Sequence, residues 1–164
     1  QAVEMEISAK DDYEKVQGND PGVLFVDVRD PLEIMFTGFT DVVHVNIPYL
    51  LADRTRWEDE RSIYRLYRNP DFVAQIKAEL ARRGMKEDAE VITLCRSGSE
   101  RGKPSAQFLR DNGLPNARYV VNGFQGSPVK DGPQAGLRIV NGWQNSGLPW
   151  SAKMSPGKMY RVDK

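Results

Sequence analysis

Cysteine and histidine are nearly absent from this chain of 164 residues, since each occurs once, as Cys95 and His44. With one cysteine the chain forms neither an internal disulfide nor a multi-cysteine metal site. A serine-histidine-aspartate triad has only His44 to use. Long apolar runs are also missing: no stretch reaches about 18 residues, the length that would predict a transmembrane helix. The sequence therefore predicts no metal, no cofactor and no membrane insertion.

A surplus of charge is lacking as well. Lysine plus arginine number 23 and aspartate plus glutamate number 23, so the formal net charge is zero. This balance argues against general nucleic-acid binding, which depends on excess positive charge. It leaves room for a local basic pocket that holds a small anion. The length fits one domain with its own core, and we expect a single domain over residues 1–164.

Short apolar strands alternate with helical patterns along most of the chain. The expected strands are Val23–Val28, Val42–Ile47, Glu90–Leu94 and Arg118–Val121, and the expected helices are Pro31–Phe36, Pro70–Arg83 and Ser105–Asn112. The third of these strands runs directly into Cys95. Alternation of this kind predicts an α/β fold, a central parallel sheet with helices on both faces. For the second helix we expect Pro70 at the first position with Asn69 as its cap.

Two stretches fall outside this alternation. Residues 53–69 hold five arginines and four acidic residues with Trp57, Tyr64 and Tyr67 among them, and we interpret them as an insertion. The charge spacing favours a solvated helix with ion pairs, and the alternative is a lid or partner surface. Residues 123–157 hold eleven of the 24 glycines and prolines, which predicts an irregular C-terminal wrap over 123–164. We expect both stretches to shape access to the site.

The segment that follows Glu90–Leu94 is the strongest candidate for chemistry. Cys95 stands at the carboxyl end of a predicted central strand and just before a helix, where open α/β sheets bind ligands. The residues after it are small, polar or charged: Arg96, Ser97, Gly98, Ser99, Glu100 and Arg101. Such a loop turns backbone N–H groups inward around an anion. These surroundings lower the pKa of a thiol from about 8.5 toward neutrality. The alternative interpretation is a buried structural cysteine.

Other polar and aromatic residues have structural interpretations. Asp27 and Arg29 are two apart and point to the same side of a strand end, and Glu33 reaches back from the next helix. We interpret these three as an ion-pair network that fixes the loops. His44 lies among apolar residues and is expected in the core or behind the site. The three tryptophans, Trp57, Trp143 and Trp150, are expected to be packing residues.

An ordered set of motifs resembles the single-domain rhodaneses. The matching segments are Asp27-Val28-Arg29 with Glu33, Asn46-Ile47-Pro48, Cys95-Arg96-Ser97-Gly98, Gln107-Phe108-Leu109, Gly113, Tyr119, Asn122-Gly123-Phe124, Gly142-Trp143 and Gly147-Leu148-Pro149. They span nearly the whole chain in the family's order. Two further segments, Phe36-Thr37-Gly38 and Gly132-Pro133-Gln134-Ala135-Gly136, resemble a bacterial subset of that family with an extended C-terminal region. The resemblance implies the rhodanese-like fold and sulfurtransferase activity.

In that activity Cys95 takes sulfane sulfur from a small anionic donor, thiosulfate or polysulfide, as a persulfide. An external thiol, or cyanide in the assay, then accepts it. Residues 96–101 form the cradle, with Arg101 and Arg96 binding the anion. The resemblance and the start at Gln1 favour an exported, periplasmic protein, with a cytoplasmic location as the alternative.

The loop departs from the commonest rhodanese form by one residue. Glu100 stands where that form has arginine, and Arg101 follows, which gives the C-x5-R spacing of cysteine phosphatases. The alternative is therefore phosphatase or arsenate reductase chemistry on the same fold, and a second is a non-enzymatic sulfur carrier or regulatory module. The extra residue lies either within the loop or after it, in Gly102-Lys103-Pro104. An inward Glu100 would repel an anion, whereas it could also point outward or pair with Arg96 or Arg101.

Overall fold

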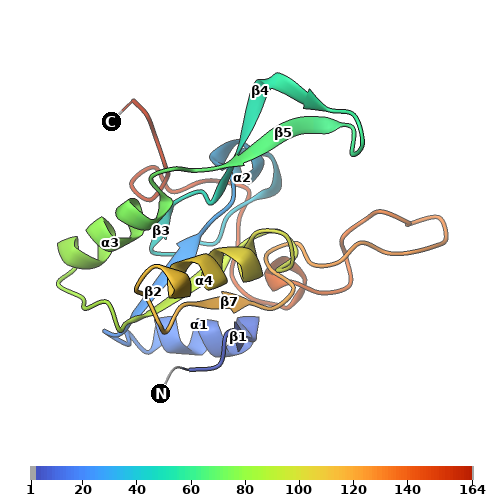
Figure 1. Ribbon diagram of the computed structural model, residues 1–164. Helices are drawn as coiled ribbons and strands as arrows, with labels where there is room; N and C mark the ends of the chain where they lie inside the picture. The colour runs from blue at the N-terminus through green and yellow to red at the C-terminus, as the bar shows by residue number, and fades with distance from the viewer. Residues whose placement is uncertain (1–2, 164) are drawn as a thin grey trace.

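A five-stranded parallel sheet organises the computed structural model, which describes residues 3–163 (Figure 1). The strands stand in the order β1-β7-β6-β2-β3, and every neighbouring pair is parallel. Their bounds are β1 Glu6–Ile7, β2 Val23–Asp27, β3 Val45–Asn46, β6 Glu90–Leu94 and β7 Arg118–Val120. The two central strands, β2 and β6, are the most apolar and were both expected from the sequence.

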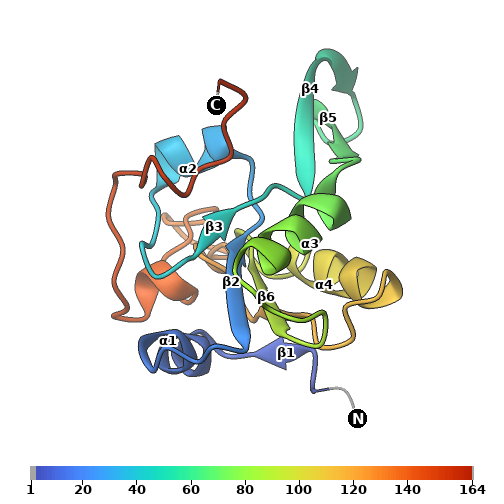
Figure 2. The ribbon, with the colours of Figure 1, turned by 90° about the vertical axis from the view of Figure 1, so that its left-hand side faces the viewer.

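Helices cover both faces of this sheet, which confirms the α/β prediction. Helices α1 (Ala9–Gln17) and α2 (Pro31–Thr37) lie on one face, and α3 (Phe72–Arg82) and α4 (Gly102–Asp111) lie on the other (Figure 2). Side chains alternate along β2, so Leu24 and Val26 pack with α3 and α4. Val23 and Phe25 pack toward α2 and the C-terminal segment. No helix in the described part of the chain is long and apolar enough to cross a membrane.

The charged stretch 53–69 is not helical, so that prediction is wrong. Strands β4 (Leu50–Glu58) and β5 (Ile63–Arg68) form an antiparallel hairpin that projects from the body of the molecule (Figure 1). Strand β5 contains one isoleucine and two tyrosines among its six residues, and these residue types favour strands. Three of the four acidic residues gather at the hairpin end, where Ser62 has a left-handed backbone (φ 53°). The charges therefore mark a turn rather than a helix face.

Some element ends differ from the sequence prediction. Helix α3 begins at Phe72 with Asp71 before it, not at Pro70. The Asn69 side chain accepts from the Asp71 N–H at 3.1 Å and donates to the Pro48 carbonyl at 3.0 Å. Asn69 therefore ties the end of the hairpin to the strand β3 region instead of capping the helix.

Strand β3 is also shorter than the expected Val42–Ile47, and α4 starts at Gly102, before Ser105. Strand β1 and helix α1 had no sequence prediction.

The C-terminal segment has one regular element among its described residues, the 3-10 helix Trp143–Asn145. Trp143 is fully buried, with its ring 5.5 Å from that of Phe25, and its indole N–H donates to the Pro149 carbonyl at 2.8 Å. Trp57 and Trp150 are 54% and 43% exposed. Trp150 packs edge-on against Phe124, with ring centroids 6.2 Å apart, and Trp57 packs against Tyr64 on the hairpin at 5.4 Å. All three tryptophans therefore pack against neighbouring rings, as predicted, but only Trp143 does so in the core.

Candidate functional site

Cys95 lies at the point in the parallel sheet where the connections that leave two neighbouring strands, β2 and β6, run in opposite directions. After β2 the chain passes through α2 to β3 on one side, and β6 lies on the other side of β2. The helices that follow these central strands, α2 and α4, cover opposite faces. Their N-termini and the loops before them diverge at this point, which is where open α/β sheets bind ligands. Cys95 directly follows β6 there.

The Cys95 sulfur is surrounded by backbone donors. The Sγ atom accepts from the Gly98 N–H at 3.0 Å and from the Gly102 N–H at 3.2 Å. Gly98 supplies one of these because its backbone is left-handed (φ 86°), and Gly102 is the first residue of α4. Donors fixed in this way stabilise negative charge on the sulfur without reorganising. Cys95 itself is 1% exposed, so this sulfur lies under its own loop.

The extra residue of the loop lies inside it. Helix α4 begins at Gly102 with Arg101 as the residue before it, so Gly102, Lys103 and Pro104 are helical. The loop therefore runs from Cys95 to Arg101, and the C-x5-R spacing belongs to the loop itself. Ser97 and Ser99 stand on its outer part, with their hydroxyl oxygens 3.1 Å apart.

A turn after β7 supports this loop from behind. The Phe124 N–H donates to the Cys95 carbonyl at 2.7 Å, and the Gln125 and Gly126 N–H groups donate to the Arg96 carbonyl at 2.9 and 3.0 Å. The turn passes so close that a Cβ on Gly123, whose φ is 59°, would overlap the Cys95 carbonyl oxygen. The segment Asn122-Gly123-Phe124 of the sequence resemblance is therefore a backbone support for the loop.

Arg101 is already paired in this structure. Its two terminal nitrogens contact the Glu33 carboxylate oxygens at 2.5 and 3.0 Å. Burial raises the pKa of the Glu33 carboxyl, but the hydrogen bonds and charge of Arg101 outweigh burial and leave that pKa below its ordinary value. Burial lowers the pKa of the Arg101 guanidinium, whereas Glu33 raises it, and the net direction is upward. Glu33 therefore occupies two of the five N–H groups of the Arg101 guanidinium.

Asp27 and Arg29 form a separate, fully buried pair. The Arg29 Nη2 lies 2.7 Å from Asp27 Oδ2, and Nε lies 3.0 Å from Oδ1. Arg29 also donates to the Thr37 hydroxyl and the Gly38 carbonyl. The pair thus joins the end of β2 to the end of α2. Glu33 contacts Arg101 instead of this pair, so the three residues expected to form one network belong to two.

Glu100 pairs with the β4–β5 hairpin. Its carboxylate lies 2.7 Å from the Arg61 guanidinium, near the end of the β4–β5 hairpin. The sequence predicted that Glu100 would face inward, point outward, or pair with Arg96 or Arg101. Its partner is Arg61 instead. The contact places the hairpin beside the Cys95 loop.

Arg138, from the C-terminal segment, is a cation of the site that the sequence analysis did not identify. Its Nη1 donates to the Gly126 carbonyl at 2.5 Å, in the turn that supports the loop. Burial and then the like charge of Arg96 lower the pKa of the Arg138 guanidinium, with Glu33 and Cys95 acting in the opposite direction. These influences place Arg138 in the electrostatic field of the loop. No local motif marks it, because it lies in an irregular stretch.

His44 takes no part in this site. Its Nδ1 accepts from the Phe25 N–H at 2.8 Å, and burial lowers its pKa to about 4. It lines a small cavity with Val23 and Arg83, toward the amino ends of the central strands. Among the described residues, no group of three histidine, cysteine or acidic side chains stands close enough to hold a metal ion.

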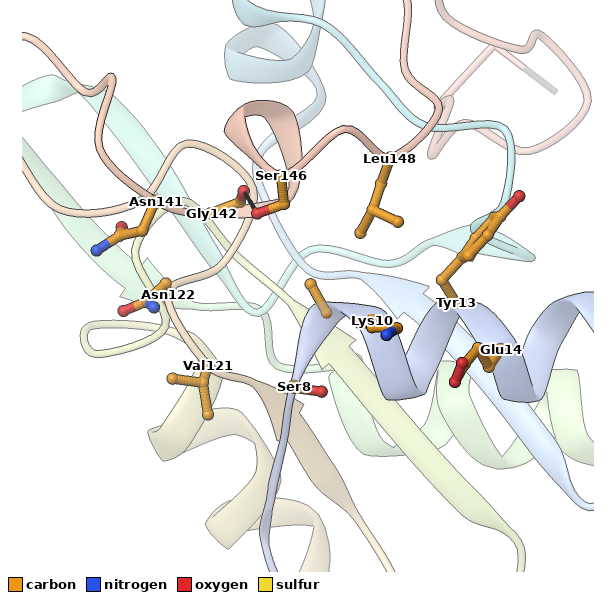
Figure 3. Close-up of a pocket in the computed structure, with 11 residues that line it drawn as sticks. Ser8, Lys10, Tyr13, Glu14, Val121, Asn122, Asn141, Gly142, Ser146 and Leu148 are labelled. Carbon is orange, nitrogen blue, oxygen red and sulfur yellow. Dashed lines mark hydrogen bonds between the residues drawn. The ribbon is translucent and has the colours of Figure 1, made fainter.

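Two cavities lie near the loop. One of about 330 Å³ is bounded by the hairpin, the start of α2 and three loop residues, Arg96, Glu100 and Arg101. A cavity of about 560 Å³ lies between α1 and the C-terminal segment (Figure 3). Figure 3 shows Ser8, Lys10 and Glu14 on the helix side, with Asn141 and Leu148 across from them. The smaller cavity is the one that the Cys95 loop lines.

Known proteins share this fold over nearly the whole chain. The sequence model described as Rhodanese-like domain matches residues 9–127. The crystal structure of Rv0390 from M. tuberculosis is 26% identical, covers 90% of this chain and 97% of its own, and has a TM-score of 0.63. A rhodanese-related protein from Thermoplasma volcanium is 19% identical, with coverages of 92% and 100% and a TM-score of 0.51. No curated protein matches the chain significantly.

Proposed function

Because the chain belongs to the rhodanese-like domain family, we propose that it is a sulfurtransferase that carries sulfane sulfur on Cys95. The observation that carries this proposal is the pair of backbone N–H donors on Sγ, at 3.0 and 3.2 Å. A thiolate or a persulfide anion is stabilised by such donors, as an oxyanion is in an oxyanion hole. The position of Cys95 at the switch point of the sheet supports the same conclusion.

In the first half-reaction the Cys95 thiolate attacks the outer sulfur of thiosulfate. A Cys95–S bond forms, the sulfur–sulfur bond of thiosulfate breaks, and its electron pair leaves with sulfite. The product is a persulfide anion, and no proton or outside oxidant is needed. Because Cys95 is 1% exposed, the loop has to open for the donor to reach Sγ.

In the second half-reaction a thiophile attacks the outer persulfide sulfur. Cyanide leaves as thiocyanate, or a thiolate leaves as a persulfide, and Cys95 returns to the thiolate. The chain holds one cysteine, so the acceptor comes from outside it. The outer sulfur is held one bond of about 2.05 Å from Sγ.

The charges around the loop suit an anionic donor. Arg96 and Arg138 act on each other and on Glu33 electrostatically, and both lie beside the Cys95 loop. Two guanidinium groups attract a dianion and orient its oxygens. In this proposal they steer thiosulfate while Arg101 stays with Glu33.

The pairing of Arg101 favours sulfur transfer over phosphatase or arsenate chemistry. Phosphate chemistry at C-x5-R needs the arginine to grip a tetrahedral oxyanion with two nitrogens. Here both terminal nitrogens contact Glu33. A sulfane sulfur needs only backbone donors, which are in place. The intact cysteine and its donors also favour an enzyme over a regulatory module.

The test is intact-mass spectrometry of the protein after thiosulfate and then after cyanide, with Cys95→Ser as the matched control. We expect the wild-type chain to gain the mass of one sulfur atom and lose it to cyanide with release of thiocyanate. The variant should gain nothing. An unmodified wild-type chain after thiosulfate and polysulfide, together with Cys95-dependent hydrolysis of an aryl phosphate, would replace this proposal with the phosphatase alternative.

A further inference from the structure

The cavity of about 330 Å³ beside the loop is a groove with one apolar wall. We call it the hairpin groove; its residues are Asp30, Leu32, Glu33, Leu50, Ala52, Arg61, Ile63, Tyr64, Leu66, Arg96, Glu100 and Arg101. The size is that of a small organic molecule and exceeds what cyanide or thiosulfate fills. The proposed reaction leaves this additional space unexplained.

The apolar wall is one face of the β4–β5 hairpin. Leu50 and Ala52 are two positions apart on β4, and Tyr64 and Leu66 are two positions apart on β5. Ala52 stands directly opposite Leu66 in the hairpin. Alternate residues of a strand point to the same face, so these four side chains form a continuous surface. Leu32 of α2 lies across the groove and is 54% exposed. A ligand with an apolar body would cover both sides.

One cation of the groove has no partner among the described residues. Arg61 pairs with Glu100 and Arg101 pairs with Glu33, which neutralises four of the six charged side chains that line the groove. The fifth, the Asp30 carboxylate, accepts from the Leu32 N–H at the start of α2 at 2.9 Å. The Arg96 guanidinium makes no hydrogen bond or ion pair within residues 3–163, and it lies close enough to Glu33 to lower the pKa of that carboxyl. An anionic group of a ligand would find its counter-charge here.

We propose that the hairpin groove binds the sulfur acceptor, and that this acceptor is an organic thiol with an apolar body and one anionic group. This rests on the proposed function. The body packs on Tyr64 and Leu66, the anionic group contacts Arg96, and the thiolate faces the Cys95 loop. The thiolate sulfur bonds to the outer persulfide sulfur, the bond to Cys95 breaks, and the organic persulfide leaves.

The kinetic test uses protein loaded with thiosulfate and freed of excess donor, mixed with three thiols. They are 4-mercaptobenzoate, its uncharged amide analogue, and 3-mercaptopropionate, which has the charge without the ring. Each rate is divided by the rate of the same thiol with a small-molecule disulfide, which removes differences in nucleophilicity. We expect 4-mercaptobenzoate to exceed each of the others by about tenfold. Equal normalised rates would overturn the inference.

A matched pair of tyrosines on β5 tests the location. Tyr64 and Tyr67 are 49% and 46% exposed and point to opposite faces of the hairpin, with Tyr64 alone lining the groove. In Tyr64→Ser, the ratio of the 4-mercaptobenzoate rate to the cyanide rate should fall about tenfold, whereas Tyr67→Ser should leave it unchanged. Equal ratios in the two variants would contradict the placement.

Binding of an unreactive analogue separates this inference from the proposed function. We expect 4-(methylthio)benzoate to shift the amide resonances of Leu66 and Arg96 and to leave that of His44, toward the amino ends of the central strands, in place. Absence of these shifts would reject the groove as a binding site even if sulfur transfer occurs. Shifts in a protein that thiosulfate fails to load would support the groove and reject the proposed donor reaction.

Discussion

Glu33 and Arg101 show how one pair of side chains sets the state of the loop. They are 68 residues apart in the chain, and their contact joins α2 to the residue that precedes α4. The side chains are 24% and 9% exposed, so the pair is shielded from solvent. Breaking a shielded pair leaves one charge without its partner, which is costly. The pair therefore ties the last residue of the Cys95 loop to α2.

Glu33→Gln tests this at the residue scale. The folded pKa of Glu33 is below its unfolded value of 4.5, so the pair stabilises the protein fully above that value and loses its effect as pH falls through the folded pKa. We expect the variant to lose about 2 kcal/mol at pH 7 and progressively less below about pH 4.5. Urea unfolding of the variant and the wild-type chain between pH 7 and pH 3 measures this difference in the free energy of unfolding. Glu60→Gln, at the exposed hairpin end, is the control, and a pH-independent difference would contradict the assignment.

The turn between β7 and the C-terminal segment is the element that fixes the shape of the active loop. Three of its N–H groups donate to the Cys95 and Arg96 carbonyls. This satisfies loop carbonyls that would otherwise be buried without partners. Gly123 allows the approach, since a Cβ there would come within 2.7 Å of the Arg96 carbonyl carbon. The atoms that a Cβ on Gly123 would meet all belong to the backbone, so no flexible side chain can move aside to make room for it.

Gly123→Ala is the prediction for this element. We expect a loss of about 2–4 kcal/mol in the free energy of unfolding, and a fall of about 100-fold in the rate of persulfide formation because the loop shifts. Urea denaturation and timed mass spectrometry measure the two. Gly132→Ala is matched, since its φ is 85° but nothing lies within 4 Å. It should cost only about 1 kcal/mol and leave the rate intact, and similar losses in both variants would refute steric contact as the cause.

At the scale of the whole molecule, the C-terminal segment completes the core of the sheet. Residues beyond 127, where the family match ends, place Trp143 on Phe25 of β2. The segment also adds a bridge between Phe39 and Ser151, and a hydrogen bond of 2.7 Å from the Asn46 N–H to the Lys158 carbonyl. These contacts cover the α2 face of the sheet. The segment therefore packs against the same core as the sheet.

Trp143→Ala measures this contribution. The side chain is fully buried, so we expect a loss of about 3–5 kcal/mol from the cavity and the lost apolar burial. Trp57→Ala is the control, because Trp57 is 54% exposed on the hairpin and should change stability by under about 1 kcal/mol. Urea unfolding of the two variants measures both losses in the free energy of unfolding. A small loss for Trp143→Ala would mean that the C-terminal segment detaches without disturbing the sheet.

The sequence by itself determined the class of fold, the central strands and the position of Cys95. Strand β6 has the predicted bounds Glu90–Leu94, and β2 differs by one residue at its end. A strand that is buried on both faces requires a continuous run of apolar residues, and such a run can be recognised from the local sequence. The place of Cys95 follows from the same pattern, because a parallel strand delivers its next residue to the carboxyl edge.

Only the tertiary structure decided the partners of the charged residues. Glu100 pairs with Arg61 across 39 residues and Glu33 pairs with Arg101 across 68, and local spacing does not encode which distant segments meet. The hairpin was mistaken for a helix because charges at helical spacing also suit a strand whose exposed face is polar. Arg138 carries no motif, since its role arises from where the irregular C-terminal segment returns. Which distant segments come into contact depends on how the whole chain packs around the sheet, and the local sequence does not specify this.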